Sequence, residues 1–409
     1  MKQIKKSQNI DWIIIIIALA LIIFGNIAIY SASVHTFGAK EGVSNYYIKQ
    51  MIWIAISALI FLTILYLPDI FIEIIAFPGY LISIFLLLLV LFLPSPDGVH
   101  RWIRLGGINF QPSELAKIFV ILFSAKILAK EKLSDLTKII ISFIIVLIPS
   151  LLVLREPDLG GSLIFLVIYL PMLYLANISL FTIFLLVSPL ISLVVGFFPV
   201  IWIIFDIVLI VILIIKNIDI LRAGVFVGIN AFVSFVAPYF WNSLRAYQQE
   251  RILTFLNPAK DMLGSGYQII QAKIAVGSGG IFGKGFLEGT QKNLEFLPAQ
   301  HTDFIFSVIG EELGFVGCSI LIILFILLFY RIIKILKKTR VISNKVIIVG
   351  ILTYLVFQVF VNIGMNIGII PVVGIPLPFI SYGGSNLIVN TAALALIVKF
   401  EKERSFIYS

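Results

Sequence analysis

The chain has 409 residues, of which 60% are hydrophobic and only 12% are charged. Soluble domains contain about 45–50% apolar and about 25% charged residues, so this composition excludes a water-soluble globular protein and also a disordered chain. The net charge of +9 does not by itself indicate nucleic acid, because the cytoplasmic loops of membrane proteins collect Lys and Arg. The single cysteine, Cys318, excludes an internal disulfide framework. The composition is that of a polytopic membrane protein.

Apolar stretches long enough to cross a bilayer as helices, about 20 residues each, recur along the whole chain. Between 178 and 241 the sequence is apolar almost throughout, and Pro199 and the basic patch at 216–222 divide it into three spans. The twelve predicted spans are 11–31, 48–67, 76–94, 111–130, 139–154, 160–177, 179–198, 200–216, 222–241, 304–330, 346–366 and 380–399. The expected fold class is an all-α polytopic membrane protein, with residues 1–409 forming a single integral membrane domain.

The distribution of Lys and Arg predicts the orientation of these helices. Basic residues gather at the two termini and in alternate loops, namely Lys2, Lys5 and Lys6; Lys126, Lys130, Lys132 and Lys138; Lys216 and Arg222; Arg331, Lys334, Lys337, Lys338, Arg340 and Lys345; and Lys399, Lys402 and Arg404. Because such loops face the cytoplasm, both termini are expected to be cytoplasmic. Topology thus accounts for the basic excess, and no nucleic-acid partner is predicted.

The longest outer loop, 242–303, is far longer than an ordinary connector, and loops of this length are usually functional or disordered. Two apolar, amphipathic pieces at 251–256 and 267–274 could lie on the membrane surface. The glycine-rich run 277–285 matches neither the phosphate-binding loop of nucleotide hydrolases nor the dinucleotide-binding pattern, so no nucleotide cofactor is expected. Tight-turn geometry is the favoured interpretation of this run, and the approach of an anion to its backbone amides is the alternative.

Asp303 lies where the long loop re-enters the membrane. A carboxylate at that depth is costly to desolvate, so it either has a structural partner or takes part in the function of the protein. One interpretation makes Asp303 a helix N-cap and the other makes it catalytic, and the residues alone leave both open. His301 and Asp303 would supply two ligands to a divalent cation, which is a weak metal signal. Glu311 and Glu312, about two turns deeper, are expected to add a carboxylate to the same cavity.

Charged residues also occur in and before the predicted span 111–130. Glu114 and Lys117 are three residues apart and share a helix face, which predicts either a structural ion pair or a polar cavity wall in which Lys117 attracts a phosphate. Arg101 has the geometry for bidentate phosphate contacts, and Trp102 is typical of an anchor at the membrane interface.

The stretch 364–384 is dense in Gly and Pro beside two predicted spans, and it contains Ser381. Irregular backbone at membrane depth is tolerated only where it is buried in protein or lines a wet cavity. Substrate passages are often built in this way, so the stretch suits a transporter as well as an enzyme.

Four segments together resemble the SEDS family (shape, elongation, division and sporulation): 101–117, 156–161, 267–317 and 364–385. Within the family, 289–298 and 370–379 resemble the elongation, RodA-like branch. The resemblance implies a bundle of about ten core helices with a large extracytoplasmic loop at 242–303. The family has about two spans between 156–161 and this loop, whereas four are predicted here, so an extra helical hairpin is expected near 179–216.

The resemblance also implies an activity, a location and a partner. The activity is a peptidoglycan glycosyltransferase of the bacterial cytoplasmic membrane that polymerises lipid II into glycan strands during cell-wall elongation and shape maintenance. It releases undecaprenyl pyrophosphate and works with a class B penicillin-binding transpeptidase. Asp303 matches the family's catalytic aspartate, and a divalent cation, Mg or Mn, is the candidate cofactor there. The expected substrate-binding residues are Glu114, Lys117, Arg101, Trp102, Lys273, His301 and Ser381.

Two other classes of function compete with this one. A lipid II flippase would have the same polar cavity and broken helices, but it needs two-sided access and often shows internal repeats, which are not evident between the two halves of this sequence. A scaffold that only positions the transpeptidase would not need a carboxylate at the point where the loop re-enters the membrane. The enzyme is therefore expected first and the flippase second.

Overall fold

The computed structural model describes residues 11–35, 42–43, 45–93, 100–105, 108–243, 249, 265–293 and 299–407. Internal contacts divide the chain into two compact units, Met1–Ala176 with Asn257–Ser409, and Asn177–Leu256. The single membrane domain expected over 1–409 stays a prediction. The predicted surface piece at 251–256 and the N-terminal lysines lie outside the described residues.

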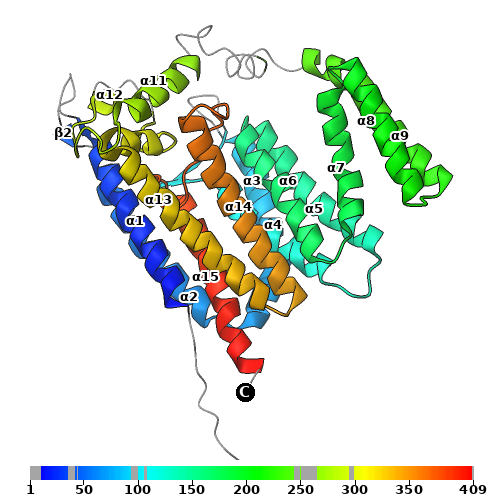
Figure 1. Cartoon of the computed structure of the whole chain (residues 1–409). Coiled ribbons are helices and arrows are strands. Elements are labelled where there is room, and N and C mark those ends of the chain that lie inside the picture. The colour runs from blue at the N-terminus through cyan, green and yellow to red at the C-terminus, as the bar shows by residue number, and fades with distance from the viewer. Residues whose placement is uncertain are drawn as a thin grey trace, which may run out of the picture. The chain divides into compact units, whose positions relative to one another are not determined.

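The first unit is a bundle of long apolar helices joined by short connections. In Figure 1, α1, α13 and α14 run side by side in blue, yellow and orange, and contacts join α13 to each of the other two. The long helices are α1 (Trp12–Ser33), α2 (Tyr46–Tyr66), α3 (Asp69–Phe92), α4 (Pro112–Leu128), α5 (Asp135–Arg155), α6 (Leu159–Leu175), α13 (Ile305–Lys338), α14 (Ile342–Asn366) and α15 (Gly384–Ile407). The shorter elements are α11 (Ser265–Ser278), α12 (Thr290–Asn293) and two antiparallel hairpins, β1 (Val34–His35) with β2 (Gly42–Val43) and β3 (Ile103–Leu105) with β4 (Ile108–Phe110).

Helix α4 is the central element of this unit. It packs against α3, α5, α6, α14 and α15, so most of its residues are buried, including Glu114 and Lys117. By contrast, α2 and α3 expose large apolar side chains such as Leu59, Phe71 and Phe85. Lipid tails solvate such side chains as well as protein does, so a membrane helix can keep its polar groups for the interior of the bundle.

Local sequence explains where several helices begin or bend. The Ser134 side chain caps α5 by accepting from the Thr137 amide, and Pro112 occupies the first turn of α4, where no amide donor is needed. Inside α13, Gly314 has φ of +64° and breaks the helical geometry. A Cβ at Gly25 of α1 would lie 2.6 Å from the Ile380 Cα, so only glycine allows the loop before α15 to approach α1 this closely.

The second unit contains the three helices α7 (Leu180–Val195), α8 (Pro199–Ile215) and α9 (Ile220–Ser243). The expected hairpin near 179–216 is present as α7 and α8, but α9 packs against both of them. Ser192 donates to the Asn230 side chain at 2.6 Å, and Asn230 donates to Ser188 at 3.0 Å, which joins α7 to α9 through buried polar groups. The second unit therefore consists of three helices and not of a single helical hairpin.

Seven described helices, α1, α2, α3, α5, α9, α13 and α14, are long and apolar enough to cross a membrane, and α6, α7 and α8 are shorter apolar helices. Together with α4 and α15, they correspond one to one with the twelve predicted spans. The boundaries shift where loops intervene. Helix α3 starts at Asp69, seven residues earlier than predicted, and α15 starts at Gly384, four residues later.

Candidate active site

Asp303 lies in the turn immediately before α13. Phe304 is the N-cap of this helix, without a side-chain capping bond, so the N-cap interpretation of Asp303 is wrong. The Asp303 backbone carbonyl accepts hydrogen bonds from Asn362 Nδ2 and Asn366 Nδ2, both at 3.0 Å. Two amides one turn apart on α14 therefore hold the backbone of Asp303 in place.

The loop before α15 holds the same turn from another direction. Ser381 Oγ donates to the Thr302 carbonyl at 2.6 Å and accepts from the Leu377 amide at 2.8 Å. The Tyr382 amide donates to the His301 carbonyl at 2.9 Å. Ser381, which was expected to bind substrate, is buried and uses its hydroxyl to join two loops. Its place in the structure is that of a positioning residue for the turn that carries Asp303.

The Asp303 carboxylate faces Gly374, because a Cβ on Gly374 would lie 3.5 Å from Asp303 Oδ2. Gly374 has φ of +72° and lines a cavity of about 30 Å³ together with Glu114, Lys117 and Asp158. A space of this size holds about one or two water molecules. Gly374 thus lies between the carboxylate before α13 and the polar wall formed by α4 and α6.

Glu114 and Lys117 form a buried ion pair in which Lys117 Nζ lies 2.8 Å from both carboxylate oxygens. Asn386 on α15 donates to Glu114 Oε2 at 3.0 Å, and Lys117 Nζ lies 5.5 Å from the centroid of the Tyr354 ring. The two interpretations of the pair are therefore compatible, because the residues are both paired and part of the cavity wall. Attraction of a phosphate by Lys117 stays a prediction.

The turn between α5 and α6 brings two more carboxyl groups to the site. Arg101 Nε donates to the Glu156 carbonyl at 3.0 Å, and Arg101 Nη2 donates to the Pro157 carbonyl. Asp158 Oδ1 accepts from the Gly161 amide at 2.9 Å and caps α6. Glu156 is fully buried, and within the described part of the chain neither carboxyl oxygen has a hydrogen-bond partner.

Burial separates the acidities of these carboxyl groups. Burial, reinforced by the negative charge of Asp158 and opposed by the Arg101 guanidinium, raises the pKa of Asp303 to about 6. Burial, reinforced by Asp158, raises the pKa of Glu156 to about 9. At pH 7 Asp303 is therefore mostly ionised, whereas Glu156 is a neutral acid.

The remaining predicted site residues lie at the edges of this arrangement. Trp102 follows Arg101 and is 39% exposed, and its role as an interfacial anchor stays a prediction. The His301 ring stacks on Tyr46 with 4.1 Å between ring centroids. Lys273 on α11 is exposed and its side chain lies along Gly368, and it makes none of the hydrogen bonds described above.

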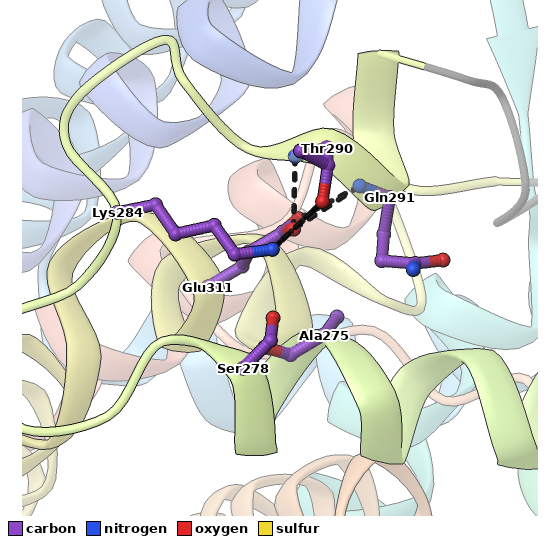
Figure 2. A network of polar contacts seen from close by, with 6 residues as sticks. All are labelled: Ala275, Ser278, Lys284, Thr290, Gln291 and Glu311. Carbon is purple, nitrogen blue, oxygen red and sulfur yellow. Dashed lines mark hydrogen bonds and ion pairs between the residues drawn. The ribbon is translucent and has the colours of Figure 1, made fainter.

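Glu311 anchors a different part of the molecule, as Figure 2 shows. Its Oε1 accepts from Lys284 Nζ at 2.7 Å, from the Thr290 amide and hydroxyl at 2.9 Å each, and from the Gln291 amide at 3.1 Å. The carboxylate is 1% exposed. It therefore connects α13 to the start of α12 and to the glycine-rich run.

Glu312 is also engaged away from Asp303, since it accepts a hydrogen bond of 2.6 Å from Ser31 Oγ at the end of α1. The expectation that Glu311 and Glu312 line the cavity of Asp303 is wrong, because Glu311 binds the segment 284–291 and Glu312 binds the end of α1. Neither side chain lines the cavity at Gly374.

The glycine-rich run 277–285 forms the tight turns expected of it. Gly280, Gly283 and Gly285 have φ of +56°, +82° and +116°. A Cβ on Gly283 would lie 2.0 Å from the Glu312 carbonyl oxygen. Close backbone contact with α13 explains this glycine, and the approach of an anion to the amides of the run stays a prediction.

The residues present do not form a set of metal ligands around Asp303. Among the described residues, no group of three or more His, Cys, Asp and Glu side chains is arranged to hold a metal ion. The second expected ligand, His301, has its ring stacked on Tyr46 and against Tyr382. The divalent cation stays a prediction, and no chemical step below depends on it.

Several residues of this site are not among those expected from the sequence. Asn362 and Asn366 are an amide pair at i, i+4 in an apolar helix, and that spacing is the signal that could have identified them. Gln358, one turn earlier, lines the cavity and is fully buried. Glu156 and Asp158 flank a proline between two spans, a pattern that contributes to the resemblance but whose carboxyl groups were not assigned to the site.

Comparison with known proteins gives one consistent result. The profile of the FtsW/RodA/SpoVE family, described as cell cycle proteins, matches residues 11–206 and 200–406. Peptidoglycan glycosyltransferase MrdB of Escherichia coli is 36% identical over 98% of this chain and 95% of its own length. Peptidoglycan glycosyltransferase RodA of Treponema pallidum is 34% identical over 97% of this chain and 98% of its own length.

Solved structures agree with these sequence matches. A chain from a peptidoglycan synthase complex that coordinates polymerization and crosslinking superposes with a TM-score of 0.70 and 28% identity, over 97% of this chain and 98% of that chain. The rod shape determining protein RodA of Thermus thermophilus has a TM-score of 0.63 at 24% identity, over 97% of each chain, and supports the fold alone. Membership is shown by the profile and by the full-length relatives together: the chain belongs to the FtsW/RodA/SpoVE family, the SEDS proteins.

Proposed function

We propose that this chain is a RodA-type peptidoglycan glycosyltransferase that polymerises glycan strands from lipid II and acts in cell-wall elongation and cell-shape maintenance. The relatives MrdB and RodA are peptidoglycan glycosyltransferases and match nearly the whole chain. The structural observation that carries the proposal is Asp303, a buried carboxylate with a pKa raised to about 6 and aimed at Gly374 on the rim of a polar cavity.

Asp303 acts as the general base in this proposal. The acceptor is a sugar hydroxyl, which becomes a competent nucleophile only as its proton is removed. The hydroxyl oxygen forms a bond to the anomeric carbon of the donor, the proton passes to Asp303, and the bond from that carbon to the lipid pyrophosphate breaks. Undecaprenyl pyrophosphate leaves with the electron pair, and a single displacement inverts the anomeric centre.

The leaving pyrophosphate gains negative charge in the transition state, which calls for cations fixed in advance. Arg101 is held by the Glu156 and Pro157 carbonyls, and Lys117 is held by Glu114. Each is therefore oriented before substrate arrives. Lys273, exposed on α11, is a candidate for contact with the lipid-linked substrate at the edge of the site.

The proposal includes a partner and an orientation. The solved synthase complex that this chain resembles couples polymerization to crosslinking, which supports a class B penicillin-binding transpeptidase as the partner. The basic loops at 126–138 and 331–345 support cytoplasmic termini in a bacterial cytoplasmic membrane. That orientation places Asp303 and the glycine-rich run on the outer side, where glycan strands are built.

The decisive experiment is polymerisation of purified lipid II by the reconstituted chain, with and without its transpeptidase partner. The active-site serine of the transpeptidase is disabled so that chain growth is seen alone. Asp303→Ala and Asp303→Asn are expected to lower the rate at least about 100-fold, since a positioned general base contributes about 10²–10⁴-fold.

Long strands from wild type and none from either variant would support both the activity and the base. Normal strands from both variants would remove Asp303 from the mechanism. If no strands form under any condition while lipid II still crosses vesicle membranes, the flippase interpretation takes first place.

A further inference from the structure

A second and larger cavity, of about 860 Å³, opens at the opposite ends of the helices that form the active site. Helix α4 contributes Glu114 and Lys117 from its first turns to the active site and Lys126 from its last turn to this cavity. Helix α14 likewise contributes Gln358 to the first cavity and Ile347 to the second. The larger cavity is thus separate from the proposed chemistry.

Cations from three parts of the chain converge on this cavity. Lys126 and Lys130 come from the end of α4, Arg340 from the connection between α13 and α14, and Lys399 from α15. Lys126, Lys130 and Arg340 are exposed and line the cavity, so their charges lie in it or at its rim. Such convergence concentrates positive potential in a confined space.

Among the described lining residues, four basic residues outnumber two acidic ones, Asp69 and Glu73. Lys399 is 4% exposed and its Nζ lies 2.8 Å from Asp69 Oδ1, and the Asp69 side chain itself is 52% exposed. Lys126 Nζ donates to the backbone carbonyl of Glu73 at 2.9 Å, an uncharged acceptor that fixes the ammonium group without neutralising it. Glu73 is the one other carboxylate among the described lining residues, against three exposed cations.

The rest of the lining is largely apolar. Ile72 and Ala76 of α3, Leu122 of α4 and Ile347 of α14 lie on the membrane-embedded side of the charged residues. A ligand that matches the whole cavity therefore has a negatively charged head and an apolar body. Its volume falls within the range of about 300–1,000 Å³ that is usual for small-molecule sites.

We propose that this cavity binds an anionic phospholipid of the cytoplasmic leaflet, with its phosphate among Lys126, Lys130 and Arg340 and the start of its acyl chains against the apolar wall. Basic pockets between transmembrane helices on the cytoplasmic side suit such head groups. The proposal rests on the orientation proposed above and is independent of the glycosyltransferase activity.

The test is lipid binding by the full-length chain in neutral detergent micelles, resolved by native mass spectrometry as bound lipids are titrated in. The probes are phosphatidylglycerol, phosphatidylcholine as the zwitterionic comparison, and free glycerol 3-phosphate as the head group without chains. The site variant combines Lys126→Gln, Lys130→Gln and Arg340→Gln. The control variant removes the same charge from exposed residues of the same face that do not line the cavity, through Lys132→Gln, Lys334→Gln and Lys337→Gln.

Phosphatidylglycerol is expected to bind at least about tenfold more tightly than phosphatidylcholine, and the site variant should lose most of this preference while the control keeps it. Equal binding of the two lipids would overturn the proposal. Equal loss in the site and control variants would also overturn it, because the preference would then come from general surface charge. If free glycerol 3-phosphate binds as tightly as the lipid, the cavity is a phosphate site and not a lipid site. Unchanged thermal unfolding of the site variant checks that it is folded.

Discussion

Asp303 illustrates how position changes the chemistry of an ordinary residue. Its backbone is held by Asn362 and Asn366, and its side chain is left to face Gly374. A carboxylate in water is a weak base, with a pKa of about 3.9. Burial raises the pKa of Asp303 to about 6, and Arg101 limits the rise. The group therefore gains basicity and still remains ionised at neutral pH.

The first prediction concerns the pH dependence of polymerisation. A general base works only when ionised, so the rate should fall about tenfold per pH unit below about pH 6 and level off above it. The measurement is the initial rate of lipid II polymerisation between about pH 5 and about pH 8, with thermal unfolding at each pH as the control. A rate that stays constant down to about pH 4.5 would assign the base to another group.

The second prediction concerns the protonation of Glu156. Because its pKa is raised to about 9, the residue is neutral at pH 7, and Glu156→Gln reproduces the neutral form closely. The variant should keep the free energy of unfolding within about 1 kcal/mol of wild type. Asp158→Ala, which removes the cap of α6, should cost about 1 kcal/mol and serves as the comparison. A loss of several kcal/mol in Glu156→Gln, measured by thermal or denaturant unfolding, would show that the native carboxyl is ionised.

At the scale of elements, glycine-rich segments allow loops to pack on helices. Gly25 leaves room for the loop before α15 to pack on α1, and Gly283 leaves room for the backbone at Glu312. Glu311 then ties the run to α13 by hydrogen bonds to Lys284, Thr290 and Gln291 (Figure 2). Residues 265–293 of the long loop are therefore an ordered part of the first unit, although the composition of the loop shows only that it is long and glycine-rich.

The third prediction tests this anchor. Glu311→Ala removes the buried acceptor of four hydrogen-bond donors and should destabilise the fold by about 2–3 kcal/mol, because the buried backbone donors are left unsatisfied. Thermal unfolding measures this loss, and protease cleavage within 279–291 should become faster. Glu288→Ala is the matched control, because it removes an exposed carboxylate three residues after the run. It should change neither the thermal unfolding nor the cleavage rate. Equal cleavage rates in the two variants would mean that Glu311 does not hold the run.

At the scale of the whole molecule, hydrophobicity determines how many helices form, and charge determines how they face. All twelve predicted spans are helices, because an apolar run in lipid must satisfy its own backbone hydrogen bonds. Basic residues at the ends of α4 and α13 predict which side of the membrane these helix ends face.

The fourth prediction tests that orientation. Cys318 is buried and is the single cysteine, so Cys318→Ala gives a background for single-cysteine variants. Ser278→Cys, exposed at the end of α11, should react with a membrane-impermeant maleimide in intact cells or spheroplasts. Lys132→Cys, exposed between α4 and α5, should react only after the membrane is permeabilised. The reverse pattern would invert the proposed topology and place Asp303 in the cytoplasm.

The sequence by itself determined the class of protein, the number of helices and the shared helix face of Glu114 and Lys117, and it singled out Asp303 as a catalytic candidate, a role that stays a prediction. These properties follow from local hydrophobicity, from helical spacing or from the cost of a carboxylate at a membrane boundary. It misassigned Glu311 and Glu312 and omitted Asn362, Asn366 and Glu156. Only the tertiary structure decided these points, because they depend on which helices pack together. The Asn362–Asp303 hydrogen bond, for example, joins residues 59 positions apart. The division into two compact units likewise depends on the packing of the helices. Residue spacing along one helix cannot specify that packing.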